Sequence, residues 1–134
     1  MASTPHPATD PEHADVLREL MAREPIFHRP EHGTTRADFE RMTDECFWEV
    51  GASGRRYSRA LVLDELERRH SGGAVAEDDL RASDFHCLQL AADTFLLTYT
   101  LAQGDRLSRR ATIWRRAGEG WKILYHQGTL VSGD

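Results

Sequence analysis

The sequence lacks the features that mark membrane and secreted proteins. No apolar run approaches the roughly 18 residues that a membrane-spanning helix needs. Residues 1–10 have neither the basic region nor the apolar core of an export signal. Only two cysteines are present, Cys46 and Cys87, so we expect reduced thiols rather than a disulfide framework. These absences predict a cytoplasmic protein with no membrane partner.

Positive charge is also scarce. The formal net charge is -5, and Lys122 is the only lysine among 134 residues. Binding to a phosphate backbone depends on a positive surface, so we expect no nucleic-acid partner. Arginine supplies the other basic charges, a bias typical of a GC-rich bacterial genome. Arginines do gather in residues 55–59 and 106–116. The low net charge therefore does not exclude an anion-binding site at either of these two groups.

The length and composition indicate one globular domain. A chain of 134 residues, 40% hydrophobic and 29% charged, has room for one core. Residues 1–10 contain two of the five prolines, together with Ser and Thr, and are expected to form a flexible tail. We therefore expect a single domain over residues 11–134, without internal repeats.

Helical spacing of apolar residues dominates the first half of the chain. Asp10 is a candidate N-cap for the first helix, and Pro25 disfavours helix at the residue before it. Thr35 and Asp38 have the spacing of a capping box. A glycine pair at 72–73 is a typical helix end. The expected helices span residues 11–24, 35–42 and 59–70.

The pattern changes to alternation in the second half. Residues 46–50 and 55–57 are expected to form two short strands, and residues 85–131 three or four antiparallel strands. Glycines at 104 and 118 mark the hairpin turns. The predicted class is α+β, with three N-terminal helices packed on a strongly curved antiparallel sheet. Such a sheet forms a cone with an interior pocket.

Three stretches carry a resemblance to a known group of proteins. FWEVGASGRRYSRALVLDEL, DTFLLTYTL and ATIWRRAGEGWKILYHQGT look like the nuclear transport factor 2-like superfamily, in its SnoaL-like and unknown-function branches. The resemblance spans residues 12–131 and implies a ketosteroid-isomerase-like, cystatin-like cone with a pocket, often in a homodimer. It implies no particular reaction, because that superfamily includes isomerases, cyclases, hydrolases, dehydratases and binding proteins. The isomerase-type tyrosine of the first helix is missing between Pro11 and Glu24, so that mechanism is not transferred.

Tight hairpin turns would divide the strand residues between two faces of the sheet. The face expected to lie under the helices carries Tyr99, Arg110, Thr112, Trp114, Trp121, Ile123, Tyr125 and Gln127. The opposite face carries Thr98, Thr100, Arg109, Ala111, Ile113, Leu124 and His126, with His126 at the surface or a dimer interface. On the covered face, Arg110 would need a carboxylate, and Glu49 is the best placed. They form either an acid/base or anion-binding pair or a structural salt bridge.

The segment after the first helix carries Glu24, His28, Glu31 and His32. Pro25 interrupts the helical presentation that a metal motif needs, so we expect no metal site. His28 is expected at the pocket mouth, as a general base or as a structural histidine. The residues predicted to bind a ligand are Glu24, Tyr57, Tyr99, Arg110, Trp114, Tyr125 and Gln127, with Glu49 and His28 as catalytic candidates. Trp114 has core packing as its competing role.

Two functions follow from these residues. One is a small-molecule-binding protein with a conical pocket, acting as a proton-transfer or hydrolytic enzyme without a cofactor. The alternative is a non-catalytic dimeric interaction module that uses the opposite face of the sheet. Whether the chain is an enzyme stays open. If Glu49 is functional, Glu49→Gln should abolish binding or activity while changing stability by less than about 2 kcal/mol.

Overall fold

The computed structural model describes residues 7–71 and 80–132. Its helices are α1 (Ala14–Met21), α2 (Arg36–Met42) and α3 (Arg59–Ser71), with 3-10 turns at Pro11–His13 and Pro30–His32. Its strands are β1 (Thr43–Val50), β2 (Arg56–Ser58), β3 (Leu80–Ala91), β4 (Thr94–Gln103), β5 (Arg106–Ala117) and β6 (Gly120–Leu130). The glycine pair expected to end α3, and residues 1–6 of the expected tail, lie outside the described residues.

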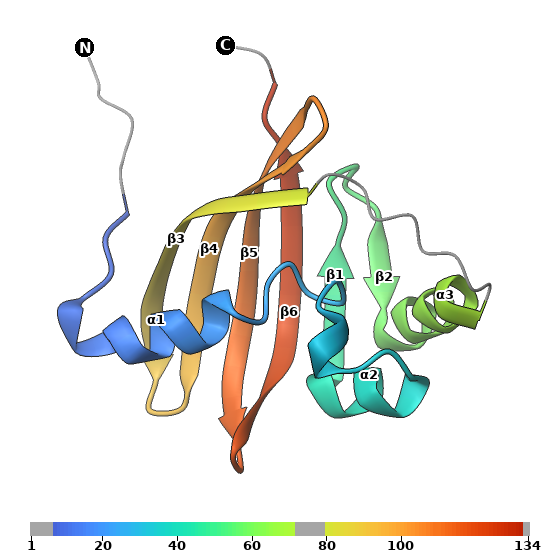
Figure 1. Ribbon diagram of the computed structural model, residues 1–134, viewed down its shortest axis with the longest axis horizontal. Helices are drawn as coiled ribbons and strands as arrows, with labels where there is room; N and C mark the ends of the chain where they lie inside the picture. The colour runs from blue at the N-terminus through green and yellow to red at the C-terminus, as the bar shows by residue number, and fades with distance from the viewer. Residues whose placement is uncertain (1–6, 72–79, 133–134) are drawn as a thin grey trace.

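The six strands form one sheet in the order β2-β1-β6-β5-β4-β3 (Figure 1). Strands β3 to β6 pair antiparallel through tight turns, with positive φ at Gly104 (60°) and Gly118 (61°). The α+β class is confirmed. The expectation of a wholly antiparallel sheet is wrong, because β1 runs parallel to β6. Parallel neighbours need a long crossover connection, and here α3 and the four strands β2 to β5 lie between them in the sequence.

The helices do not all precede the sheet in the sequence. Strands β1 and β2 come before α3. Helix α1 crosses the sheet at the β3 side, whereas α2 and α3 lie at the β1 and β2 side (Figure 1). α1 ends at Met21 rather than at the predicted Glu24, and residues 22–29 then cross between the two groups of helices. The most deeply buried apolar side chains are Leu20, Phe39, Leu63, Leu97 and Ile123.

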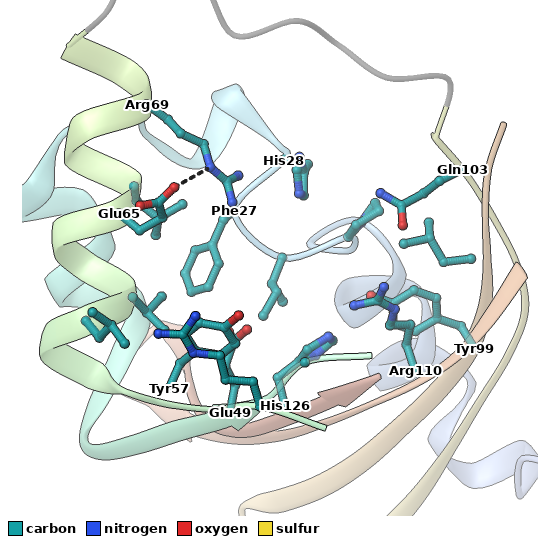
Figure 2. A pocket seen from close by; sticks show the side chains of 18 residues that line it. Phe27, His28, Glu49, Tyr57, Glu65, Arg69, Tyr99, Gln103, Arg110 and His126 are labelled. Carbon is teal, nitrogen blue, oxygen red and sulfur yellow. Dashed lines mark ion pairs between the residues drawn. The ribbon is translucent and has the colours of Figure 1, made fainter. Parts of the chain in front are cut away.

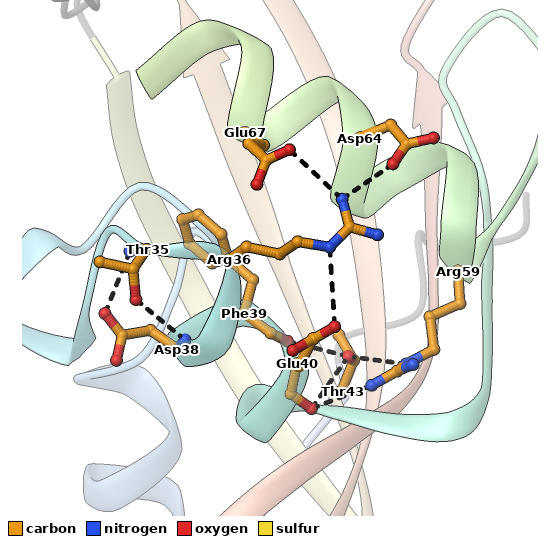
Figure 3. A network of polar contacts seen from close by, with 9 residues as sticks. All are labelled: Thr35, Arg36, Asp38, Phe39, Glu40, Thr43, Arg59, Asp64 and Glu67. Carbon is orange, nitrogen blue, oxygen red and sulfur yellow. Dashed lines mark hydrogen bonds and ion pairs between the residues drawn. The ribbon is translucent and has the colours of Figure 1, made fainter. Parts of the chain in front are cut away.

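A polar network joins α2 to α3 (Figure 3). The predicted capping box is confirmed: Thr35 Oγ1 accepts from the Asp38 amide at 3.2 Å, and the Asp38 carboxylate accepts from the Thr35 amide at 3.0 Å. Arg36 reaches across to α3, where its Nη1 lies 2.8 Å from Asp64 Oδ1. The buried Thr43 hydroxyl accepts from Arg59 Nε at 3.0 Å. These contacts fix α3 over the start of β1.

A β-bulge in β6 changes which side chains face the helices. Ile113 pairs with Tyr125, but the next residue, Trp114, pairs with Ile123, so Leu124 is an extra residue in β6. One extra residue reverses the alternation of the strand beyond it. The predicted faces of Tyr125, Gln127 and His126 are therefore wrong. Tyr125 and Gln127 lie on the outer face, and His126 is buried on the helix-covered face.

The described part of the expected tail touches the sheet. Thr9 Oγ1 accepts a hydrogen bond of 2.9 Å from the Cys87 amide, and the Asp10 carboxylate caps the first turn by accepting from the Glu12 amide at 2.9 Å. Cys46 is exposed and Cys87 is buried, and neither is in a disulfide. Among the described residues, no helix combines the length and apolar character needed to cross a membrane.

Candidate functional site

A cavity of about 500 Å³ lies between the sheet, α3 and the segment that follows α1 (Figure 2). Apolar side chains of α3 and of Pro25, Ile26 and Phe27 line one part of it. Charged and polar side chains from the strands line the other. This volume falls within the range of about 300–1,000 Å³ that is usual for small-molecule sites. More than half of the lining residues are polar or charged, so the cavity is more polar than most such sites.

The polar floor is a row of side chains set by strand register. Glu49 on β1 pairs with Tyr57 on β2 on one side and with His126 on β6 on the other. The next row contains Arg110 on β5, which pairs with Tyr99 on β4. In Figure 2, His126 lies in the middle of the floor. Glu49 and Tyr57 lie on one side of it, and Arg110 and Tyr99 lie on the other. The structure therefore brings together five groups, one from each of five strands, at one surface of the cavity.

Glu49 is a half-buried carboxyl with an altered acidity. Burial raises its pKa, whereas the positive charges of Arg110 and Arg69 lower it by a smaller amount. Among the described residues, Glu49 and Arg110 form no contact ion pair, so of the two alternatives for these residues the structural salt bridge is not formed. A raised pKa makes the Glu49 carboxylate a stronger base than an exposed glutamate.

Arg110 is held in a fixed orientation. Its Nε donates to Ser108 Oγ at 2.9 Å. Gly128 lies opposite on β6, and a Cβ at that glycine would lie only 2.8 Å from Arg110 Cζ. Only glycine leaves room for the guanidinium there. No carboxylate among the described residues pairs with Arg110, so its remaining N–H groups can bind an anion in the cavity.

His126 is a neutral histidine at the cavity floor. Burial, the charge of Arg110 and that of His28 lower its pKa to about 3. Its Nδ1 lies 2.7 Å from Thr112 Oγ1 on β5, a hydrogen bond between two buried side chains. This bond fixes the ring, so the other nitrogen, Nε2, is the one left for the cavity.

Glu24 lies beneath the cavity and is not among the residues that line it. It is 0% exposed, and its carboxylate accepts from Tyr99 Oη at 2.7 Å, Trp114 Nε1 at 3.1 Å and the Ile26 amide at 3.0 Å. Burial raises the Glu24 pKa to about 7, although these hydrogen bonds and the Thr112 side chain oppose the shift. No cation forms an ion pair with it among the described residues, which is unusual for a buried carboxyl.

The remaining predicted residues divide between the cavity and other places. His28 and Tyr57 line the cavity, as does Tyr99, whose hydroxyl points at Glu24. Trp114 is buried in the core next to Glu24 and does not line the cavity. Tyr125 and Gln127 lie on the outer face of the sheet, which excludes them from this site.

The segment that carries His28 is held by an aromatic cluster. Phe27, with φ 67°, packs edge to face against Phe39 and Phe47, with ring centroids 5.7 and 6.2 Å apart. Further along, His32 bonds the Ala22 carbonyl oxygen at 3.1 Å. Within residues 7–71 and 80–132, no three His, Cys, Asp or Glu side chains are grouped as a metal site.

Comparisons with known proteins show the fold. No protein-family model and no curated protein sequence matches this chain. Among solved structures, a protein of unknown function from the DUF3225 family of Pectobacterium atrosepticum matches with a TM-score of 0.63 and 20% identity, covering 93% of this chain and 100% of that one. A proposed dehydratase of the nuclear transport factor 2-like family from Streptomyces avermitilis matches with a TM-score of 0.68 and 14% identity, covering 89% and 98%.

The chain has the nuclear transport factor 2-like fold. A protein with a cystatin-like fold from Caulobacter vibrioides also matches, with a TM-score of 0.60, 12% identity, and coverage of 90% of this chain and 91% of that one. The predicted resemblance in fold is confirmed. At these identities the likeness shows the nuclear transport factor 2-like fold alone, and function rests on the site.

Sequence reasoning missed the buried half of the site. His126 was placed on the wrong face, and Thr112 was placed on the correct face without a role. One signal was present: a glycine within a strand, here Gly128, often marks a bulge or a close approach. The bulge places Gly128 opposite Arg110, whereas an unbroken hairpin would pair it with Arg109.

Proposed function

We propose that this protein binds a small organic anion in the cavity and exchanges a proton with it through Glu49. The observation that carries the proposal is the arrangement of the floor. A guanidinium without a carboxylate partner among the described residues lies on one side of His126, and a carboxyl with a raised pKa lies on the other. Arg110 would hold the negative group of the ligand, and Glu49 would face a carbon or oxygen further along it.

The chemistry that fits this pairing is proton transfer next to a carboxylate. A base removes a proton from the ligand, and the fixed positive charge of Arg110 stabilises the negative charge that develops. Isomerisation and dehydration both begin in this way, and the Streptomyces avermitilis neighbour is a proposed dehydratase. Hydrolysis would need the same base to activate a water molecule instead.

Anion binding is tested with small carboxylic acids and their matched primary amides, by calorimetry on wild-type protein and two variants. Arg110→Gln should weaken acid binding at least tenfold, because a hydrogen bond to a charged group contributes about 1.5–3 kcal/mol. Arg109→Gln is the matched control, since Arg109 is the neighbouring residue on the outer face, bonded to Thr100 Oγ1 at 2.6 Å. Equal losses in both variants, or amides that bind as well as acids, would contradict the proposal.

Proton exchange is tested in D₂O with the acids that bind. Wild-type protein should catalyse deuterium incorporation at the carbon next to the carboxylate or carbonyl group, detected by mass spectrometry. Glu49→Gln should bind the same acids and lose the exchange, because the amide has no basic oxygen of comparable strength. Exchange at the wild-type rate in Glu49→Gln would assign the base to another residue.

A second candidate function is self-association through the outer face of the sheet. An apolar row crosses five strands there, because Trp48, Tyr125, Ile113, Leu96 and Leu88 are successive register partners. Trp48 is 44% and Leu88 59% exposed, and such a continuous exposed row is typical of an interface. We propose a second copy of this chain as its occupant.

Sedimentation velocity at micromolar concentration measures this association directly. Wild-type protein should sediment as a dimer and Leu88→Asp as a monomer. Leu130→Asp is the control, because Leu130 is 43% exposed but pairs with the buried Ser108 on the other face of the sheet. A monomeric wild type, or a dimer that only the control variant breaks, would argue against this interface.

A further inference from the structure

Arg55 is a second cation at the cavity to which the proposed function gives no role. It lines the cavity, and it forms no ion pair with any acidic side chain of residues 7–71 and 80–132. Its guanidinium carbon lies 5.3 Å from the centre of the Tyr57 ring, which is within the range of a cation–π contact. Tyr57 also lines the cavity. The aromatic ring therefore holds a positive charge at the rim of the cavity.

A glycine turn sets the position of Arg55. The Gly54 amide donates to the Gly51 carbonyl oxygen at 2.8 Å, and the Gly51 amide donates to the Arg55 carbonyl oxygen at 2.9 Å. Gly54 has a φ of 91°, which glycine adopts without strain. A Cβ at Gly51 would lie 3.2 Å from Tyr57 Cε2, so the Tyr57 ring packs against the turn. The backbone therefore fixes the start of the Arg55 side chain, and the Tyr57 ring supports its end.

The third arginine that lines the cavity already has a partner. Arg69 Nε lies 3.7 Å from Glu65 Oε1, one turn earlier on α3 (Figure 2). An anion at Arg69 would have to compete with this carboxylate for the same positive charge. Within the part of the chain that the structure describes, the arginines of the cavity lining without a carboxylate partner are therefore Arg55 and Arg110.

These two arginines lie on opposite sides of Glu49 and His126. Tyr57, which holds Arg55, pairs with Glu49, and Glu49 pairs with His126. Arg110 follows on β5, the next strand of the sheet. In the strand order β2-β1-β6-β5, three spacings of about 4.8 Å separate the backbones of Tyr57 and Arg110, or roughly 14 Å. A ligand that contacts both arginines must therefore pass over Glu49.

We propose that the ligand is a dicarboxylate, which binds Arg110 with one carboxylate group and Arg55 with the other. This inference rests on the proposed function, in which Arg110 holds the first carboxylate, and adds the class of acid and a second binding group. The carbon chain between the two carboxylates lies over Glu49, which exchanges a proton with it. Each charged end of the ligand then faces a guanidinium, and the uncharged middle faces the Glu49 carboxyl.

The two arginines contribute unequally to binding. Arg110 is half-buried and held by Ser108 at 2.9 Å, whereas Arg55 is exposed, so water and salt screen its charge. An ion pair at an exposed site changes an affinity by up to about fivefold. Arg55 therefore provides selectivity among acids, and Arg110 provides most of the affinity.

Calorimetry with straight-chain dicarboxylic acids from succinic to pimelic acid, each compared with its monoamide, tests the second binding group. The monoamide keeps one carboxylate and replaces the other by a neutral group of similar size. Wild-type protein should bind at least one dicarboxylic acid more tightly than its monoamide. Arg55→Gln should lower this ratio of affinities by about fivefold, and Arg55→Lys, which keeps the charge, should retain most of it. Arg56→Gln is the matched control, because Arg56 is exposed and does not line the cavity.

The ratio of affinities separates this inference from the proposed function. No preference for any dicarboxylic acid in wild-type protein, or equal ratios in wild type and Arg55→Gln, would overturn the second binding group. A ratio that Arg69→Gln loses and Arg55→Gln keeps would also overturn it. In these three cases monocarboxylic acids still bind through Arg110, and the proposed function stands. If Arg110→Gln binds every acid as well as wild type does, the first carboxylate site fails and the dicarboxylate proposal fails with it.

Discussion

Replacing Glu24 by glutamine should change how stability depends on pH. The folded-state pKa of Glu24 is raised from 4.5 to about 7, so the folded state binds this proton more tightly than the unfolded state does. The resulting stabilisation is fully present below pH 4.5 and is lost as the pH rises through 7. Each pH unit within that window corresponds to about 1.4 kcal/mol.

The magnitude follows from the two units between pH 5 and the folded-state pKa of about 7. The wild-type free energy of unfolding should fall relative to that of Glu24→Gln by about 3 kcal/mol between pH 5 and pH 8. His126 acts in the opposite direction, because its pKa is lowered to about 3 and its contribution is lost as the pH falls. Both proteins contain His126, so the difference between them isolates Glu24.

Urea unfolding followed by tryptophan fluorescence at pH 5, 6, 7 and 8 measures the difference. The free energy of unfolding of Glu24→Gln should also be lower by a constant amount at every pH, because the glutamine amide leaves one of its buried neighbours without an acceptor. Glu31→Gln removes an exposed carboxyl from the same segment and should run parallel to wild type. A wild-type minus Glu24→Gln difference that stays constant from pH 5 to pH 8 would refute the assignment of a raised pKa.

Two further substitutions test how the site and its support are built. Gly128→Ala should displace the Arg110 guanidinium, because its Cβ would lie 2.8 Å from Arg110 Cζ, and should weaken acid binding in calorimetry. Stability in urea unfolding should change by less than about 1 kcal/mol, because the displaced atoms are the movable end of a long side chain. Unchanged acid binding in Gly128→Ala would exclude this clash. Thr35→Ala should lower stability by about 1 kcal/mol through the lost helix cap, whereas Thr34→Ala, which keeps its backbone bond to Asp38, should change it by less than about 0.5 kcal/mol.

Local chemistry made the regular parts of the fold predictable. The capping box at Thr35 and Asp38 and the hairpin turns at Gly104 and Gly118 are short-range features, each determined by a few neighbouring residues. The pairing of β1 with β6 could not be predicted in the same way. It joins segments about half the chain apart, and an eight-residue strand does not specify its partner.

The bulge at Leu124 explains why the sequence pattern puts His126, Tyr125 and Gln127 on the wrong faces. Large side chains alternate through Trp121, Ile123 and Tyr125, so the sequence alone continues the pattern without interruption. The extra residue ends that alternation and turns His126 inward. Sequence patterning cannot detect this, because both registers bury an aromatic ring and differ only in the polar partner that His126 finds in Thr112.

The burial of Glu24 was also beyond sequence reasoning. Its position before Pro25 indicates an exposed loop, and carboxyl groups are rarely buried without a cation. Its partners come from β4 and β5, more than 70 residues away. Only the folded arrangement shows that Tyr99 and Trp114 provide donors at the place where the chain leaves α1.

Native mass spectrometry with the panel of small carboxylic acids tests the central claim most directly, because it counts subunits and retained molecules together. Wild-type protein and Arg109→Gln should each retain one acid per subunit, and Arg110→Gln should lose it. Retention at equal levels in all three proteins, or no retention of any acid by the wild type, would contradict an anion site at Arg110.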